Sequence, residues 1–206
     1  MTFFKEQCRR MHSFYHGDFS YYLRITAAAF LTIVVVSFVF GMAAPDFSSK
    51  LVEQFAQQVS DLGILQGNAT LLAAGLFANN LRVILIGIIY GLLPMVYLPA
   101  LSLGINASML GVFAAYSMHN GISLWQYALS ILPHGIFELP ALVISLAMGF
   151  YLCHCTTLRL RKKTQGLVKS ALGECMRVVA MHIIPLLFVA AVIESFVTPR
   201  ILELIH

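Results

Sequence analysis

A histidine and two glutamates in apolar surroundings are the residues of this sequence best suited to chemistry. His134 and Glu138 are four positions apart, so a helix would carry them on one face, and Glu194 stands in a later apolar run. Imidazole and carboxylate groups bind divalent metals and carry protons. The spacing is not the H-E-x-x-H of zinc proteases, which disfavours proteolysis. A metal on His134 and Glu138 is the less favoured reading. The alternative that we favour is a packing network in which Arg82 neutralises Glu138 or Glu194.

The composition shows what surrounds these residues. Of the 206 residues, 59% are hydrophobic and 11% are charged, and the mean hydropathy is +0.84. A soluble domain needs more charged surface than this, so we expect an integral membrane protein. The net charge is +4, but the basic residues flank apolar runs, where they orient a chain against anionic lipid. Membrane lipid is therefore an expected partner, and nucleic acid is not.

Five apolar runs are long enough to cross a bilayer, because about 20 helical residues span its hydrocarbon core of about 30 Å. The sequence predicts an all-α, polytopic membrane helix bundle that forms one domain. Pro94 and Pro99 divide a long apolar stretch into a helical hairpin. We expect a further break at Pro133, which would separate an interfacial or re-entrant segment, 123–132, from the next span. The predicted transmembrane helices are 25–44, 77–97, 100–118, 133–152 and 178–197.

An amphipathic helix is expected in the segment 45–75. Leu51, Phe55, Val59 and Leu62 recur there at helical spacing, and Gly63 ends the pattern. This segment holds a single basic residue up to the next predicted span, Lys50, so we place it outside the cytoplasm.

Two basic segments set the expected orientation. The lead 1–24 carries four lysines and arginines, and the predicted loop 153–177 carries six. Basic segments stay in the cytoplasm, and four spans between them satisfy this rule for both. The sequence therefore predicts a multi-pass protein of the cytoplasmic (inner) membrane with its N-terminus inside and its C-terminus outside.

Helical rise then places the polar residues by depth. A rise of about 1.5 Å per residue brings residues from three spans, and His119 just after another, into one polar layer near the outer surface. Asn106 and His182 lie deeper, toward the cytoplasm. Charged groups at membrane depth are costly, so each of them needs a partner or a function. The expected layer consists of Asn79, Asn80, Arg82, His119, His134, Glu138 and Glu194.

Small residues predict where helices approach closely. Gly87 and Gly91 are four apart in one span, and Ala107 and Gly111 are four apart in the next. Such pairs let membrane helices pack backbone against backbone. We favour packing within the chain, with a homodimer as the alternative.

The stretch from Phe77 to Tyr151 resembles the stage II sporulation protein M family. The likeness rests on Phe77-x2-Asn80, on the glycine and asparagine positions above, and on the segment Pro133-His134-Gly135-Ile136-Phe137-Glu138-Leu139-Pro140-Ala141 followed by Gly149. The resemblance implies a prokaryotic, multi-pass protein of the cytoplasmic membrane. In endospore formers, the family implies a role in engulfment through the localisation of peptidoglycan-degrading partners at the septum.

Two functions follow as hypotheses. The first is a non-enzymatic membrane scaffold without a cofactor, which docks extracytoplasmic or membrane protein partners through the 45–75 helix or the spans. The second is a dimeric transporter or channel for a small solute or an ion. Its path would pass His134, Glu138 and Glu194 and continue past Asn106 and His182.

Overall fold

The computed structural model describes residues 2–61, 69–162 and 166–205, and all regular structure in them is helical. Five helical stretches are long and apolar enough to cross a membrane: α2, α4, α5, α6, and the run from α7 through α8. These observations confirm the predicted all-α fold with five candidate spans. The helices are α1 (Thr2–His16), α2 (Phe19–Ala43), α3 (Pro45–Asp61), α4 (Ala69–Tyr90), α5 (Pro99–His119), α6 (Leu124–Lys162), α7 (Leu167–Val178), α8 (Ile184–Phe196) and α9 (Thr198–Ile205), with a π-helical segment, η1 (Val179–Ile183), between α7 and α8.

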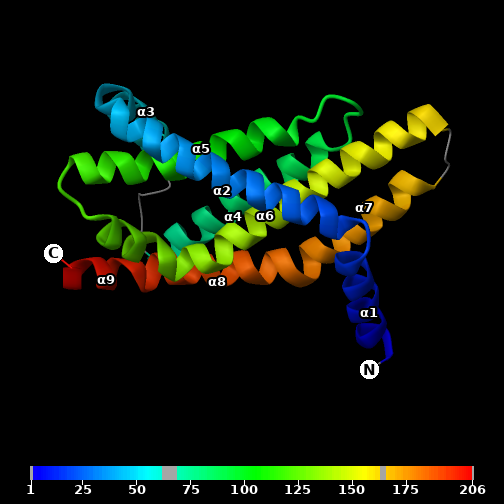
Figure 1. Ribbon diagram of the computed structural model, residues 1–206. Helices are drawn as coiled ribbons and strands as arrows, with labels where there is room; N and C mark the ends of the chain where they lie inside the picture. Colours follow the sequence, from blue (N-terminus) through cyan, green and yellow to red (C-terminus); the bar gives the residue numbers. More distant parts are fainter. Residues whose placement is uncertain (1, 62–68, 163–165, 206) are drawn as a thin grey trace.

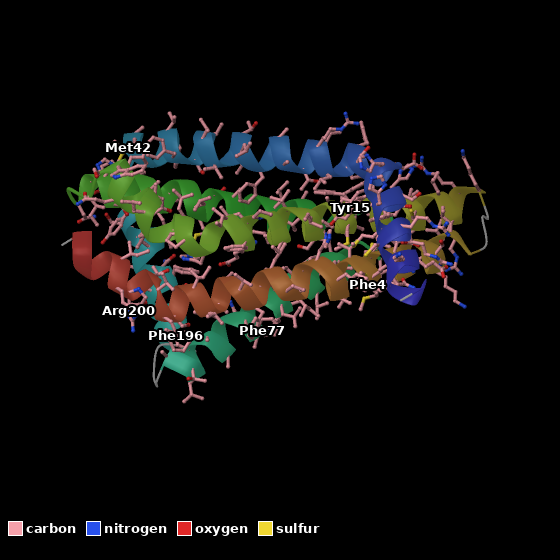
Figure 2. All side chains as sticks on the ribbon, turned by 90° about the horizontal axis from the view of Figure 1, so that it is seen from below. Phe4, Tyr15, Met42, Phe77, Phe196 and Arg200 are labelled. Atoms are coloured by element: carbon pink, nitrogen blue, oxygen red, sulfur yellow. The ribbon has the colours of Figure 1, made fainter. Side chains whose placement is uncertain are left out.

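Helix α6 is the centre of the bundle. It contacts α2, α4, α5, α7, α8 and α9, whereas α2 packs most extensively on α5. The long helices run side by side, and α1 projects away from them at one end (Figure 1). Figure 2 shows α2 along one edge of the bundle and α4, which carries Phe77, along the other. The largest buried cluster joins α1, α2, α4, α6, α7, η1 and α8.

The expected break at Pro133 is wrong, because α6 continues through both Pro133 and Pro140. From Leu124 on, the segment 123–132 is therefore the first part of α6 and not a separate piece. Within a bilayer, a helix tolerates proline because its other backbone groups have no water to bond to and stay paired internally. Helix α6 begins with a capping box, in which the Ser123 N–H donates to Gln126 Oε1 at 2.9 Å and the Gln126 N–H donates to Ser123 Oγ at 3.2 Å. Its 39 residues extend about 58 Å, well beyond a hydrocarbon core of about 30 Å.

The expected loop 153–177 is also mostly helical. Helix α6 runs on to Lys162, and α7 begins at Leu167. The basic residues near the end of α6 lie on exposed positions, while the buried side of α7 packs against α6 through Ala171 and Cys175. An amphipathic pattern thus extends both helices beyond the apolar runs that predict the spans.

The last span is one helical run with a π-helical segment in it. Pro185 has no N–H to donate to the Met181 carbonyl, and the Ile184 N–H donates five residues back, to the Val179 carbonyl. Proline therefore widens one turn here instead of ending the helix.

The predicted amphipathic segment 45–75 is divided between two helices. Helix α3 ends at Asp61, and α4 begins at Ala69, while Leu62 and Gly63 lie outside the described residues. Helix α3 packs against α5, where the Phe55 and Phe113 rings lie 5.2 Å apart between centroids. Its apolar side therefore faces the protein.

The small residues lie where helices approach closely. A Cβ atom on Gly91, just after α4, would stand 2.2 Å from the Gly149 carbonyl oxygen of α6. A Cβ on Gly111 of α5 would stand 2.3 Å from the Val34 carbonyl oxygen of α2. Both distances are impossible, so only glycine fits either position without moving backbone. Gly87 packs beside Leu146, and Ala107 is fully buried. Each of these contacts is made within the chain.

Candidate functional site

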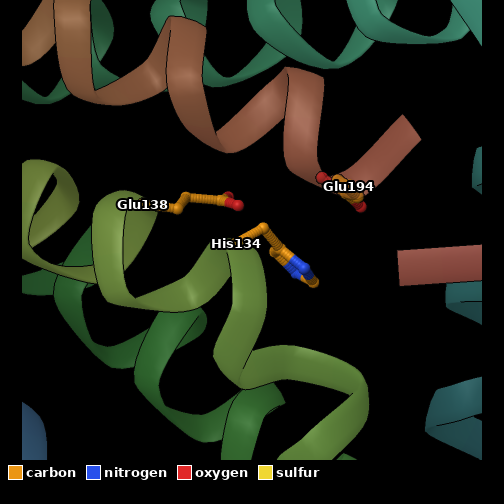
Figure 3. A group of neighbouring side chains, drawn as sticks. All are labelled: His134, Glu138 and Glu194. Atoms are coloured by element: carbon orange, nitrogen blue, oxygen red, sulfur yellow. The ribbon is translucent and has the colours of Figure 1, made fainter. Parts of the chain in front are cut away.

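His134, Glu138 and Glu194 form a compact cluster between α6 and α8. One ligand atom from each side chain, an imidazole nitrogen or a carboxylate oxygen, lies within 4.8 Å of the other two. Figure 3 shows the three side chains extending into the space between the two helices. All three are half-buried. The cluster thus joins a central helix to the last span.

Local structure fixes each member of the cluster. His134 and Glu138 are one helical turn apart on α6, directly after Pro133. Glu194 lies near the C-terminal end of α8, where the Val197 N–H still donates to the Ile193 carbonyl at 2.8 Å. Thr198, the first residue of α9, places its Oγ1 3.4 Å from His134 Nδ1. The turn from α8 into α9 therefore brings a hydroxyl to the histidine.

The two carboxylates of the cluster are not paired with positively charged side chains of the described chain. The side-chain amide of Asn80, on α4, faces the Glu138 carboxyl. Glu138 and Glu194 are close enough to repel each other when both are ionised. The ion pairs within the described residues are Arg10 with Glu6 and Arg177 with Glu174, both away from the cluster. Neither carboxylate thus has a cationic side chain as its partner.

The expected ion pair of Arg82 with Glu138 or Glu194 is not formed. Arg82 is exposed on α4, and no carboxylate of the described chain lies within 4.0 Å of its nitrogens. The reason is its direction around the helix: Asn80 turns toward α6, and a residue two positions further on points about 200° away from it. Asn79 is half-buried beside Asn80.

His119 also lies apart from the cluster. It is exposed at the end of α5, and its Nε2 lies 3.3 Å from the Gly41 carbonyl oxygen of α2. Of the seven residues of the expected layer, four meet: Asn80, His134, Glu138 and Glu194.

The deeper polar residues have other partners. The Asn106 side-chain amide donates to the Ser102 carbonyl of its own helix at 2.8 Å, so it does not link helices as the packing network required. His182 lies in η1, and its Nδ1 is 3.1 Å from the hydroxyl of Tyr15 on α1. This contact ties the projecting helix α1 to the last span.

Two hydroxyl residues near the cluster were not foreseen from the sequence. Thr198 is 7% exposed and contacts His134, and Ser195 is 5% exposed with no hydrogen-bond partner for its Oγ among the described residues. Hydroxyl side chains are common in membrane helices, where they usually bond to the preceding turn. The signal that could have found them is their spacing, since positions 194, 195 and 198 share one face of a helix that continues past residue 197.

Most of the chain matches one known protein family. The family model for stage II sporulation protein M matches residues 26–199, which include four of the five candidate spans in full and most of α2. The chain belongs to this family. Within the stage II sporulation protein M family, it is similar to a protein of undetermined role from the archaeon Methanocaldococcus jannaschii. The two are 28% identical over 184 residues, which is 87% of this chain and 97% of the relative. No solved structure matches the chain.

The family match includes the residues of the site as well as the helices. The matched range contains Asn80, the Pro133 to Ala141 segment, Glu194 and Thr198. The resemblance drawn from the sequence is thereby confirmed. The chain is accordingly a membrane protein of the stage II sporulation protein M family.

Proposed function

We propose that this chain is a non-enzymatic scaffold of the cytoplasmic membrane, which holds membrane partners against its apolar surface. The observation that carries the proposal is a groove of about 550 Å³ between α2, α5 and α6. The groove is lined by Val34, Val35, Phe38, Leu110, Gly111, Ala114, Leu124, Tyr127, Ala128, Ile131, Leu132, Gly135, Ile136, Leu139 and Pro140.

The groove suits a transmembrane helix of another protein. Ala114, Ala128 and Gly135 are small, and small residues let a second helix approach its neighbours closely within a bilayer. Val35 is 60% exposed and Leu132 is 46% exposed, so the margins of the groove are open to a partner. Pro140 also has no N–H to donate to the Ile136 carbonyl, which leaves an acceptor on this side of α6.

The transporter alternative has less support in the geometry. A path from the cluster toward the other end of the bundle would use Asn106 and His182. Asn106 bonds to its own helix, and His182 bonds to Tyr15 of α1. Both side chains therefore serve structural contacts, which favours the scaffold.

The family name directs the proposal toward the cell wall. In an endospore former, the partners would be peptidoglycan-degrading enzymes that act at the septum during engulfment. A relative in an archaeon favours a wider role, the organisation of partners in the membrane. The exposed polar side of α3, with Glu53, Gln54 and Gln57, offers soluble segments of such partners a second contact.

Site-directed photocrosslinking in native membranes tests this function. A photoreactive residue at Val35 or Leu132 should capture one membrane protein, which mass spectrometry identifies. The matched controls are Phe188 and Val189 on α8, which are apolar and exposed but lie outside the groove. Ala128→Phe should fill the groove and abolish the capture. Only lipid adducts at Val35 and Leu132, or the same protein captured from Val189, would refute the scaffold.

A further inference from the structure

We propose that His134, Glu138 and Glu194 together bind one divalent transition-metal ion of the zinc type between α6 and α8. The donor set is one imidazole nitrogen and two carboxylate oxygens, all mutually within 4.8 Å. A tetrahedral zinc ion with bonds of about 2.0 to 2.2 Å holds its ligand atoms about 3.4 Å apart. Small rotations of the two glutamate side chains close this difference, because each has three rotatable bonds.

Charge balance points to a divalent cation. Two ionised carboxylates carry a charge of −2, and no arginine or lysine in the described chain pairs with them. A divalent ion neutralises both at once in surroundings where unpaired charge is costly. A single proton shared by the two carboxyls would leave one negative charge, which only a protonated His134 could balance within the cluster.

The ligand types select the class of ion. Calcium and magnesium favour sites built from oxygen alone, whereas an imidazole with carboxylates suits zinc, manganese, iron or cobalt. His134 supplies its nitrogen from the centre of the cluster. Its Nδ1 already meets the Thr198 hydroxyl at 3.4 Å, which leaves Nε2 for the metal.

Buried polar groups around the cluster give independent support. The Ser195 hydroxyl is next to Glu194 in the chain, is 95% buried and has no hydrogen-bond partner in the described structure. A buried hydroxyl of this kind is costly unless something bonds to it. Three protein ligands leave the fourth zinc position to a water molecule. Asn80, directed at Glu138, orients a carboxylate in the way that outer-shell amides orient metal ligands.

The consequence is a metal bond between the central helix and the last span. Helix α8 contacts α6 and α4, and an ion held by residues of both α6 and α8 would tie these two helices together near the start of α9. Binding should therefore stabilise the folded protein.

Metal binding to the full chain, without an affinity tag and reconstituted in lipid nanodiscs, tests the proposal. After treatment with a chelator, equilibrium dialysis against Zn²⁺ should give one ion per chain. His134→Ala and Glu194→Gln should each weaken binding at least tenfold. Glu53→Gln, on the exposed face of α3, and His12→Gln, on α1, are matched controls that should leave binding unchanged. Binding that survives Glu194→Gln but is lost in His12→Gln would overturn the site.

A spectrum of the wild-type protein covers the case in which the variants do not fold. Co²⁺ substituted for zinc should give visible d–d bands of a site with nitrogen and oxygen ligands, and it should raise the melting temperature. Intense thiolate-to-cobalt charge transfer would instead assign the ion to cysteine ligands, which the cluster does not contain. That result, or no bound metal at all, refutes the proposal.

Discussion

Glu138 faces the side-chain amide of Asn80, whereas Arg82, two positions further along α4, is exposed and forms no ion pair with any described residue. The free energies of unfolding should reflect this difference. Residues without contact have additive effects within about 0.5 kcal/mol, whereas residues in contact show coupling of about 0.5 to 3 kcal/mol. We expect additivity for Arg82→Ala with Glu138→Ala and coupling for Asn80→Ala with Glu138→Ala. Thermal or chemical unfolding in a mild detergent measures both cycles.

The two cycles serve as controls for each other, because they share Glu138→Ala. Strong coupling of Arg82 with Glu138 would mean that the arginine turns inward in the membrane.

Depth could be predicted from the sequence, since helical rise and the number of spans place His134, Glu138 and Glu194 at one level. The direction of Arg82 and the position of His119 could not, because direction around a helix depends on which neighbours pack against it.

At the scale of the helix, the two glycines of α5 make opposite predictions. A Cβ at Gly111 would meet Ser37 Oγ and the Val34 carbonyl oxygen, at 2.2 and 2.3 Å, while a Cβ at Gly104 has no atom within 4 Å. Gly111→Ala should therefore separate α2 from α5 and destabilise the fold by about 1 to 3 kcal/mol. Gly104→Ala, seven residues earlier, should be neutral or add up to about 1 kcal/mol. The midpoints of thermal unfolding in detergent compare the two variants.

Equal losses from the two glycine variants would show that helix propensity, and not the crossing of α2 and α5, sets the effect.

The small-residue pattern indicated close packing in advance, but it did not identify the neighbour. The sequence also did not predict that α6 continues through Pro133. The expectation that proline ends a helix comes from helices in water, where the carbonyl that loses its partner bonds to solvent. This expectation is weaker inside a bilayer.

The whole molecule has two chemically different ends. Helix α1 and the junction of α6 with α7 lie at one end, and α3 and the C-terminus lie at the other (Figure 1). Lys5, Arg9 and Arg10 stand on α1, and Arg159, Arg161 and Lys162 end α6. Because basic residues remain on the cytoplasmic side, we expect the first end to be inside the cell.

Cysteine labelling with a reagent that does not cross membranes measures this orientation. After the four native cysteines are replaced, Gln57→Cys on α3 should be labelled in intact cells. Ser170→Cys on α7 should be labelled only after the membrane is permeabilised. Both positions are exposed, so accessibility to the reagent depends on the side of the membrane. Labelling of Ser170→Cys in intact cells would reverse the orientation.

The pairing of α2 with α5 determines the order in which the chain can be assembled during synthesis. Helix α2 packs most extensively on α5, and α2 and α4 make no contact with each other in the described residues. The first span to leave the ribosome is therefore inserted before its main neighbour, residues 99–119, has been translated. Its exposed valines, isoleucine and phenylalanine are compatible with lipid contact during this interval. A nascent chain that stops before Pro99 would hold two spans, α2 and α4, that do not contact each other. A membrane quality-control protease could remove such a chain before any bundle exists.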